Sequence, residues 1–434
     1  MQVFSLRKSK FFLECVALGP RLDYYETRSM KLTLLGSTGS IGTSTLEVVR
    51  QNPDRFQIHA LVAGRNVEAL ASQILEFSPS AAVVADSETL KRLQGHLTEL
   101  GVARNEWPEL AAGADARVTA ATDTNAQFVM SAIVGVAGLE ATYAAIKKRK
   151  RVGLANKEVL VASGRLVMEA ARMAGAELIP VDSEHNGAHQ CFRAGTRNEV
   201  TRLLLTASGG PFRDTPRDFL WQVTPEQALN HPTWKMGQRI TVDSATMMNK
   251  GFEVIEACWL FDLPPSQVDV VVHPQSSIHA MVEYNDGSII AQVSATDMKM
   301  PIQYALTYPE RHRAPVPRLD WTKPRTWDFL APDFEKFRLL KLAYQAQEQG
   351  GSASCTLNAA DEIAVEAFLD RQIPFPSIAL VVEETLQRQI SREPGTIEEV
   401  LAIDAESRTV ARQIVAEMRP TSGVYGTGGR DVRL

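Results

Sequence analysis

The fold of this chain is decided by the stretch KLTLLGSTGSIG at residues 31–42. The apolar run at 31–35 predicts a buried strand, and a helical pattern follows from Thr45 to Arg50. A strand, a glycine-rich turn and a helix in this order bring backbone N–H groups and a helix N-terminus to a pyrophosphate. The glycine spacing is GxxGxxG, which alone is weak evidence because glycines occur in many strand-to-helix turns. In this context it predicts a dinucleotide-binding fold.

The second predicted strand, Ile58 to Ala63, ends in Gly64-Arg65-Asn66. A site that prefers NAD usually has an acid here, which binds the ribose 2′-hydroxyl. This chain has none at that position, and Arg65 can instead neutralise a 2′-phosphate. The competing interpretation is a solvated loop arginine. The missing acid together with the arginine favours NADP over NAD.

Further short strands alternate with helical segments, which predicts a doubly wound parallel sheet; they are expected at 81–84, 128–134 and 152–155. Ligands of such sheets lie beyond the carboxyl ends of the strands. Asn156-Lys157-Glu158 occupies one such end, so Lys157 is placed to meet a substrate or a nicotinamide, and Glu158 opens the next helix. A lysine after a strand is more often only a solvated loop residue.

Two carboxylates, Asp182 and Glu184, follow the apolar run 178–181. If the backbone is extended there, residues i and i+2 point to the same side, and both side chains reach one cation. Glu253 is a third acid that can complete the site. Three carboxylates without a thiolate or a clear imidazole set favour a hard cation, Mg²⁺ or Mn²⁺. Solvated strand-end acids are the alternative for Asp182 and Glu184 taken alone.

A group of polar side chains suited to a phosphate surrounds the third acid. Ser244 is expected near the start of a helix whose apolar stripe is Met248, Phe252, Ile255 and Trp259. Asn249 lies four residues before Glu253, Lys250 adds a positive charge, and the helix N-terminus favours an anion. Ser208 follows the run 203–205 and precedes two glycines, although a plain turn is the better explanation of that segment taken alone.

Composition restricts the class of protein. The 434 residues are 44% hydrophobic and 22% charged, with 46 Lys+Arg against 51 Asp+Glu, as in an ordinary globular protein of several domains. The net charge of -5 and the lack of a basic run argue against nucleic-acid binding, and no apolar run is long enough for a membrane span. Four scattered cysteines predict reduced thiols and a cytoplasmic protein.

Several motifs together resemble the 1-deoxy-D-xylulose 5-phosphate reductoisomerase family. They occur in the family's order from about residue 31 into the C-terminal region, and their combination is specific although no single one is. The motifs are GSTGSIG at 36–42, ANKE at 155–158, PVDSEHN at 180–186, SGGPF at 208–212, HPTWKMG at 231–237, VDSATMMNKG at 242–251 and HPQS at 273–276.

The resemblance implies NADPH-dependent conversion of 1-deoxy-D-xylulose 5-phosphate to 2-C-methyl-D-erythritol 4-phosphate, an early step of non-mevalonate isoprenoid synthesis. It implies that Asp182, Glu184 and Glu253 bind the metal. It assigns phosphate and substrate contacts to Ser183, Glu184, Ser208, His231, Trp234, Ser244, Asn249, Lys250, Glu253 and His273. It makes Lys157 the substrate-facing lysine and places Trp234 and Met236 in a mobile flap. Glu184 is also a candidate proton relay.

The cofactor contacts expected on this basis are Thr38, Gly39, Ser40, Ile41, Gly64, Arg65, Asn66, Asn156, Glu158 and Gly237. His189 lies four residues after His185, but the family motif does not require it, and it is expected to be structural. His273 follows the predicted strand 268–272, where a packed strand-end histidine is nearly as good an explanation as a substrate contact.

The expected architecture is a Rossmann-like domain at 31–180, an α+β catalytic and dimerisation domain at 181–310, a linker at 311–333 and a helical domain at 334–434. A hairpin is predicted from 278–284 and 289–293 around Asn285-Asp286-Gly287-Ser288, and the family is homodimeric. Residues 1–30 are expected to be a loosely ordered extension or the result of an upstream start, and the tail from 421 to be mobile.

Two alternative functions remain at this stage. One is a different NADP-dependent, metal-assisted reductase of a phosphorylated sugar-like substrate, which would not turn over the pentulose phosphate. The other is an NADPH-binding sensor without catalysis, which the presence of Lys157, Asp182, Glu184 and Glu253 argues against.

Overall fold

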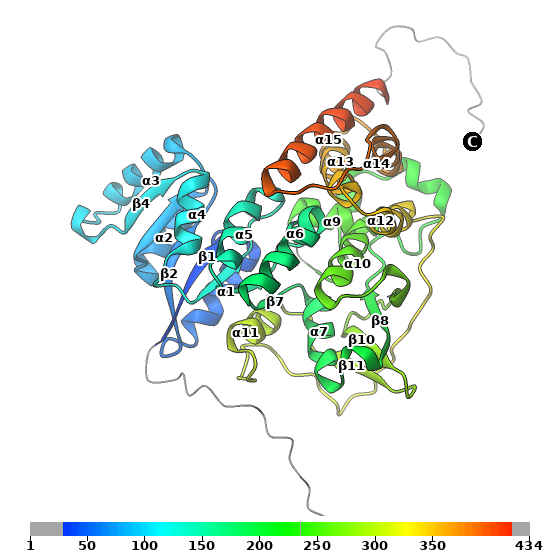
Figure 1. The fold of residues 1–434 in the computed structure, drawn as a ribbon, viewed down its shortest axis with the longest axis horizontal. Helices are drawn as coiled ribbons and strands as arrows, with labels where there is room; N and C mark the ends of the chain where they lie inside the picture. The colour runs from blue at the N-terminus through cyan, green and yellow to red at the C-terminus, as the bar shows by residue number, and fades with distance from the viewer. Residues whose placement is uncertain (1–28, 235, 419–434) are drawn as a thin grey trace, which may run out of the picture.

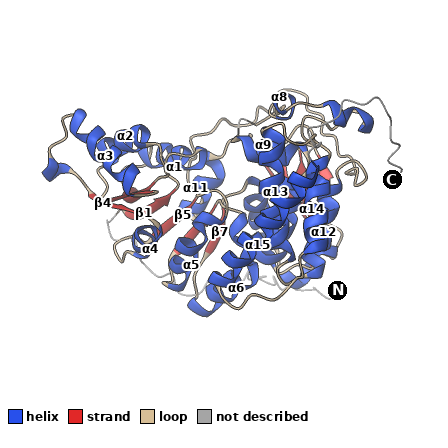
Figure 2. Ribbon diagram, turned by 90° about the horizontal axis from the view of Figure 1, so that it is seen from above, coloured by secondary structure: helices blue, strands red, loops and turns tan. Residues whose placement is uncertain are grey.

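Seven parallel strands form the first sheet of the computed structural model, which describes residues 29–234 and 236–418. The strand order is β4-β3-β2-β1-β5-β6-β7, and Figure 2 shows helices on both faces. The strands are β1 Met30–Leu35, β2 Phe56–Val62, β3 Ala81–Val84, β4 Glu109–Ala112, β5 Phe128–Ser131, β6 Arg151–Leu154 and β7 Leu178–Pro180. The helices are α1 Ser40–Arg50, α2 Val67–Phe77, α3 Ser87–Glu99, α4 Ala114–Thr122, α5 Leu139–Lys147 and α6 Glu158–Ala174. The predicted doubly wound parallel sheet is confirmed.

Two apolar cores lie on the two faces of this sheet because successive strand side chains point to opposite sides. Leu34 packs in one core with α1 and α2, and its neighbour Leu35 packs in the other with α5 and α6. The predicted strand 128–134 is shorter in the structure and ends at Ser131. Strand β4 was not predicted, because ELAA contains no β-branched residue and lies at the sheet edge, where its side chains are partly exposed.

A second, mixed sheet has the order β11-β10-β8-β9, and its hairpin has the predicted bounds. Its strands are β8 Val200–Ala207, β9 Val268–Val272, β10 Ile278–Tyr284 and β11 Ile289–Val293. The helices of this part are α7 Ser183–Cys191, α8 Pro225–Ala228, α9 Gln238–Ala245 and α10 Met248–Phe261. Helices α7 and α10 share an apolar core with the sheet.

Four helices complete the described chain: α12 Arg338–Gln349, α13 Ala353–Leu369, α14 Ser377–Arg388 and α15 Ile397–Met418. Figure 1 shows these helices, in yellow to red, beside α6, α9 and α10. Helix α11, Lys299–Thr307, instead packs on α1 of the first sheet. Residues 308–337 form no helix or strand apart from a bridge between Leu330 and Val272.

Two local predictions on backbone conformation were wrong. Asp182 is not in an extended strand: it is the N-cap of α7, and Glu184 lies in the first helical turn. Ser244 does not begin the helix with the apolar stripe but lies in the last turn of α9. The helical conformation is interrupted at Met247, whose φ is 64°, and α10 begins at the next residue. Each of these polar residues lies at the end of a helix, where its type is compatible with a helical or an extended backbone, and tertiary packing selects one of the two.

The extension was predicted at 1–30 and the mobile tail from 421; residues 1–28 and 421–434 lie outside the described residues, and Met30 already belongs to β1. Among the described residues, no helix is both long enough and apolar enough to cross a membrane.

The glycine turn after β1 is closely packed. A Cβ on Gly42 would lie 2.2 Å from the carbonyl oxygen of Gly36, whereas the nearest such contact at Gly39 is an ordinary 3.5 Å. We therefore expect Gly42→Ala to destabilise the protein by about 2 kcal/mol or more, because the backbone of the turn must move. Gly39→Ala in the same turn is the matched control and should change the free energy of unfolding much less. Denaturant unfolding measures both, and equal losses would contradict this account of the turn.

Candidate active site

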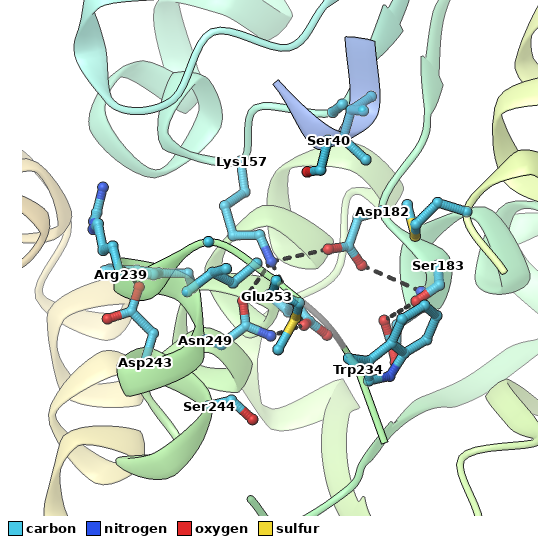
Figure 3. Close-up of a pocket in the computed structure, with 18 of the residues that line it drawn as sticks. Ser40, Lys157, Asp182, Ser183, Trp234, Arg239, Asp243, Ser244, Asn249 and Glu253 are labelled. Carbon is cyan, nitrogen blue, oxygen red and sulfur yellow. Dashed lines mark hydrogen bonds and ion pairs between the residues drawn. The ribbon is translucent and has the colours of Figure 1, made fainter. Parts of the chain in front are cut away.

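A single cavity of about 740 Å³ lies where the carboxyl ends of the first sheet meet α7, α9 and α10. Its lining includes the glycine turn on one side and the polar residues of α10 on the other. Figure 3 shows Ser40 facing this space across from Asn249 and Ser244. The glycine turn and the acidic residues therefore open into the same space.

The three predicted acids converge. Oxygen atoms of Asp182, Glu184 and Glu253 all lie within 4.8 Å of one another. Asp182 and Glu184 meet because the first turn of α7 brings them together, and the Glu184 backbone N–H donates to Asp182 Oδ1 at 3.2 Å. Glu253 arrives from α10, where its side chain is 1% exposed. This set of carboxylate oxygens is suited to a hard divalent cation.

Two lysines neutralise the acids. Lys157 Nζ lies 2.9 Å from Asp182 Oδ2 and 3.6 Å from Glu253 Oε1, and it donates to Asn249 Oδ1 at 2.7 Å. Lys250 Nζ forms an ion pair with Glu253 and lies 3.7 Å from Glu184 Oε1. Buried charges require such partners. Lys157 comes from the turn between β6 and α6, so it links the first sheet to α7 and α10.

The pKa values follow from burial and these charges. Burial alone would lower the pKa of Lys157, but the charges of Asp182 and Glu253 raise it above its ordinary value. Burial raises the pKa of Glu184 to about 8 against the effect of Lys250, and the neighbouring charges of Glu253 and Asp182 add to the rise. Asp182 behaves in the opposite way: burial opposes ionisation, yet Lys157 holds its pKa below the usual range.

His185 does not line the cavity; it contacts the backbone of Glu253 and the side chain of Glu256. The ring is completely buried, with Nδ1 2.9 Å from Glu256 Oε2 and Nε2 2.8 Å from the Glu253 carbonyl oxygen. His189 Nδ1 lies 2.9 Å from the Tyr304 hydroxyl of α11 and is likewise outside the cavity lining.

His231 forms the centre of a second polar group. Its Nδ1 accepts hydrogen bonds from the backbone N–H groups of Thr233 and Trp234 at 3.1 and 2.9 Å. The proton of the neutral ring is therefore on Nε2, which lies 3.1 Å from the Ser208 hydroxyl and 3.0 Å from the Ser244 hydroxyl. Burial lowers the pKa of His231, so the ring is neutral at pH 7. Two hydroxyls and one imidazole N–H thus converge from three segments.

The predicted substrate residues mostly line the cavity. Ser183, Ser208, His231, Trp234, Ser244, Asn249 and Lys250 do so together with the three acids and Lys157. Trp234 is partly buried and lines the cavity. His273 is not in the lining: its ring is buried, bonded to the Asp328 carbonyl and stacked on Phe329. That contact fits the packed strand-end histidine.

The predicted cofactor residues fall into two groups. Gly39, Ser40, Ile41, Asn156, Glu158 and Gly237 line the cavity, whereas Thr38, Gly64, Arg65 and Asn66 lie outside its lining. Asn66 caps α2 by accepting from Ala69 N–H. The Arg65 side chain is 79% exposed, and its Nε lies 3.6 Å from Asp86 Oδ2.

Sequence reasoning missed several lining residues. Ser276 and the segment 296–298 reach the cavity from loops after β9 and β11, and Arg239 and Asp243 reach it from α9. Polar residues in the loop that follows a strand are a usable indication for Ser276, Thr296 and Asp297. Arg239 lies in the loop-to-helix segment after the HPTWKMG motif, and nothing in its local pattern distinguishes it from a solvated arginine.

Comparisons with known proteins agree with this geometry. Residues 32–164 match the family model described as 1-deoxy-D-xylulose 5-phosphate reductoisomerase, and residues 178–261 and 293–410 match models of its C-terminal domains. The reductoisomerase of Solibacter usitatus is 64% identical over 383 residues, which cover 88% of this chain and 96% of that protein. This chain belongs to the 1-deoxy-D-xylulose 5-phosphate reductoisomerase family.

Solved reductoisomerase structures have the same fold. The Zymomonas mobilis enzyme in complex with NADPH is 47% identical with a TM-score of 0.84, covering 90% of this chain and 100% of that one. A DOX-P reductoisomerase in complex with NADPH, fosmidomycin and magnesium is 41% identical with a TM-score of 0.83, covering 89% of this chain and 98% of that one.

Proposed function

We propose that this chain converts 1-deoxy-D-xylulose 5-phosphate to 2-C-methyl-D-erythritol 4-phosphate, using NADPH and Mg²⁺ or Mn²⁺. The observation that carries the proposal is the convergence of three carboxylates beside the glycine turn in one cavity. Its close reductoisomerase relatives, two of which are solved with NADPH, support the same reaction.

The three acids Asp182, Glu184 and Glu253 are the proposed metal ligands, because they are all oxygen donors within reach of one another. A bound divalent cation would polarise the substrate ketone and its neighbouring hydroxyl, and NADPH would supply the reducing equivalents. The backbone of the glycine turn and the start of α1 would hold the pyrophosphate, and Arg65 would face the 2′-phosphate.

The phosphate is proposed to lie against His231, Ser208, Ser244, Asn249 and Lys250. The His231 Nε2–H and the two serine hydroxyls can all donate to phosphate oxygens, and the Lys250 ammonium is a buried positive charge nearby. Trp234 and Met236 line the cavity, and we propose that these two side chains exclude water from the bound substrate.

Lys157 and Glu184 are the proposed catalytic groups. Lys157 is held between Asp182 and Asn249, so its ammonium can stabilise negative charge that develops on substrate oxygens. Glu184 lines the cavity beside the Lys250 ammonium and is the proposed proton relay among the substrate hydroxyls.

The reaction itself is tested by mixing the protein with 1-deoxy-D-xylulose 5-phosphate and following the loss of NADPH absorbance. We expect oxidation of NADPH that EDTA abolishes and added Mg²⁺ or Mn²⁺ restores. A reductase of another sugar phosphate would oxidise NADPH only with its own substrate, and a sensor would bind NADPH without turnover. Either result would refute the proposal.

The metal assignment is tested with Glu253→Gln. Losing one of three carboxylates should weaken Mn²⁺ binding by at least about 10-fold in a calorimetric titration. Glu169→Gln is the control, because Glu169 is a surface acid of α6 that pairs with Arg165. Equal Mn²⁺ affinities of the two variants would exclude Glu253 as a ligand.

The relay assignment is tested with Glu184→Gln at saturating Mn²⁺. Turnover should fall by roughly 10²-fold or more, the usual contribution of a positioned proton carrier. A variant that binds Mn²⁺ and retains most of its turnover would show that Glu184 carries no proton.

We also propose a homodimer that pairs through the edge of the second sheet. Strand β11 is the edge strand, and its Ile289 and Ile290 are 52% and 38% exposed. An apolar edge strand is a surface that proteins normally cover. Light scattering should give twice the chain mass, and Ile289→Lys should reduce it; a monomeric wild type would refute the pairing.

We place the enzyme in the cytoplasm, because Cys191, Cys258 and Cys355 are buried free thiols that suit a reducing compartment. Cell fractionation tests this location, and recovery of the protein outside the cytoplasm would contradict it.

A further inference from the structure

Arg239 joins three parts of the molecule through one partly buried guanidinium. Its Nη1 donates to Glu158 Oε1 and to Glu362 Oε1, both at 2.8 Å, and its Nη2 donates to Asn358 Oδ1 at 2.9 Å. The side chain is 19% exposed. Glu158 opens α6, whereas Glu362 and Asn358 belong to α13. The planar guanidinium therefore bonds to the first domain and to the C-terminal helices at the same time.

The C-terminal side of this contact is itself braced. Glu362 Oε2 accepts from Arg408 Nη2 of α15 at 2.6 Å, and Asp404 accepts from Arg408 Nε at 2.6 Å. Glu362 also faces the loop after β5, since a Cβ on Gly135 would lie 3.4 Å from its Oε1. The neighbouring residues 133 and 134 line the cavity. Helices α13 and α15 thus reach the edge of the active site through Glu362.

The other side of the contact lies next to the proposed catalytic lysine. Glu158 directly follows Lys157, so a bond that holds Glu158 also holds the turn from which the Lys157 side chain extends. Arg239 lies in the first turn of α9, and Ser244 in the last turn of that helix. Figure 3 shows Arg239 and Asp243 together on the side of the cavity opposite Trp234. The Nε of Arg239 lies 3.6 Å from Asp243 Oδ2.

We propose that Arg239 is a positioning residue that sets the Lys157 turn relative to α9, with Glu362 of the C-terminal helices as its anchor. The inference rests on the proposed function and extends it to α13, which supplies none of the proposed metal-binding or phosphate-binding residues. The physical reason is geometric. Lys157 and Ser244 both line the cavity, and the segments that carry them are joined by the bonds of Arg239 to Glu158 and Glu362. A misplacement of about 1 Å between such groups costs roughly 10²-fold in rate.

The test compares Arg239→Met with Arg165→Met. Arg165 also ties α6 to the C-terminal region, because its guanidinium pairs with Glu393 and donates to the Pro394 carbonyl. It does not line the cavity. Arg239→Met should lower kcat by about 10²-fold with the KM for NADPH nearly unchanged. Arg165→Met should leave kcat within about 2-fold of the wild type, since the active-site bonds remain.

If Arg239→Met does not fold, two conservative variants test the same inference. Arg239→Lys retains the charge but can make fewer of the bonds, so its kcat should fall between those of the wild type and the methionine variant. Glu362→Gln weakens the anchor, and combining it with Arg239→Lys should cost less than the sum of the two single changes. Additive losses would overturn the inference.

Hydrogen exchange gives a readout that does not depend on turnover. Amides of 156–160 and 238–245 should exchange faster in Arg239→Met than in Arg165→Met under conditions where both are folded. Equal kcat and equal exchange in the two variants would overturn the inference, and so would a loss that lies wholly in the KM for NADPH, which would make Arg239 a cofactor ligand. A wild type without turnover would instead refute the proposed function. The exchange comparison would still test whether Arg239 holds the Lys157 turn against α9.

Discussion

Three carboxylates within 4.8 Å of one another in a largely buried cleft are the constraint on which the rest of the site depends. Like charges at this distance repel strongly where water is scarce, so the cluster persists only with cations beside it. In the protein alone Lys157 and Lys250 supply that charge. The three acids are the ligands proposed for a divalent ion, which would add further positive charge to the cluster. Burial is the main cause of the raised pKa of Glu184, and this repulsion adds to it.

The fold creates this cluster by bringing two separate strand-to-helix transitions together. Lys157 follows β6, and Asp182 follows β7, the neighbouring strand of the same sheet. Glu253 and Lys250 come from α10, which packs against the second sheet. The acids therefore lie at the junction of the two sheets, and the cofactor turn after β1 opens into the same cavity. Ligand binding at the carboxyl ends of the strands is the rule for parallel sheets.

Local patterns were sufficient where the short-range chemistry is distinctive. The glycine turn, the hairpin at 278–293 and the helical C-terminal region could be predicted because glycine spacing, turn residues and helical periodicity act over a few neighbours. The site residues could be grouped only with the help of the family resemblance. His273 illustrates the limit, because a histidine after a strand looks the same whether it faces a cavity or, as here, packs against Phe329.

By itself, the sequence determined which chemical groups are available: acids for a hard cation, a glycine turn for a pyrophosphate, and hydroxyls with a lysine for a phosphate. Only the tertiary structure decided how these groups meet. The turn of α7, and not an extended strand, brings Asp182 and Glu184 together, and Arg239 joins α9 to helices more than a hundred residues away. Contacts between distant segments depend on packing and burial, which short stretches of sequence do not record.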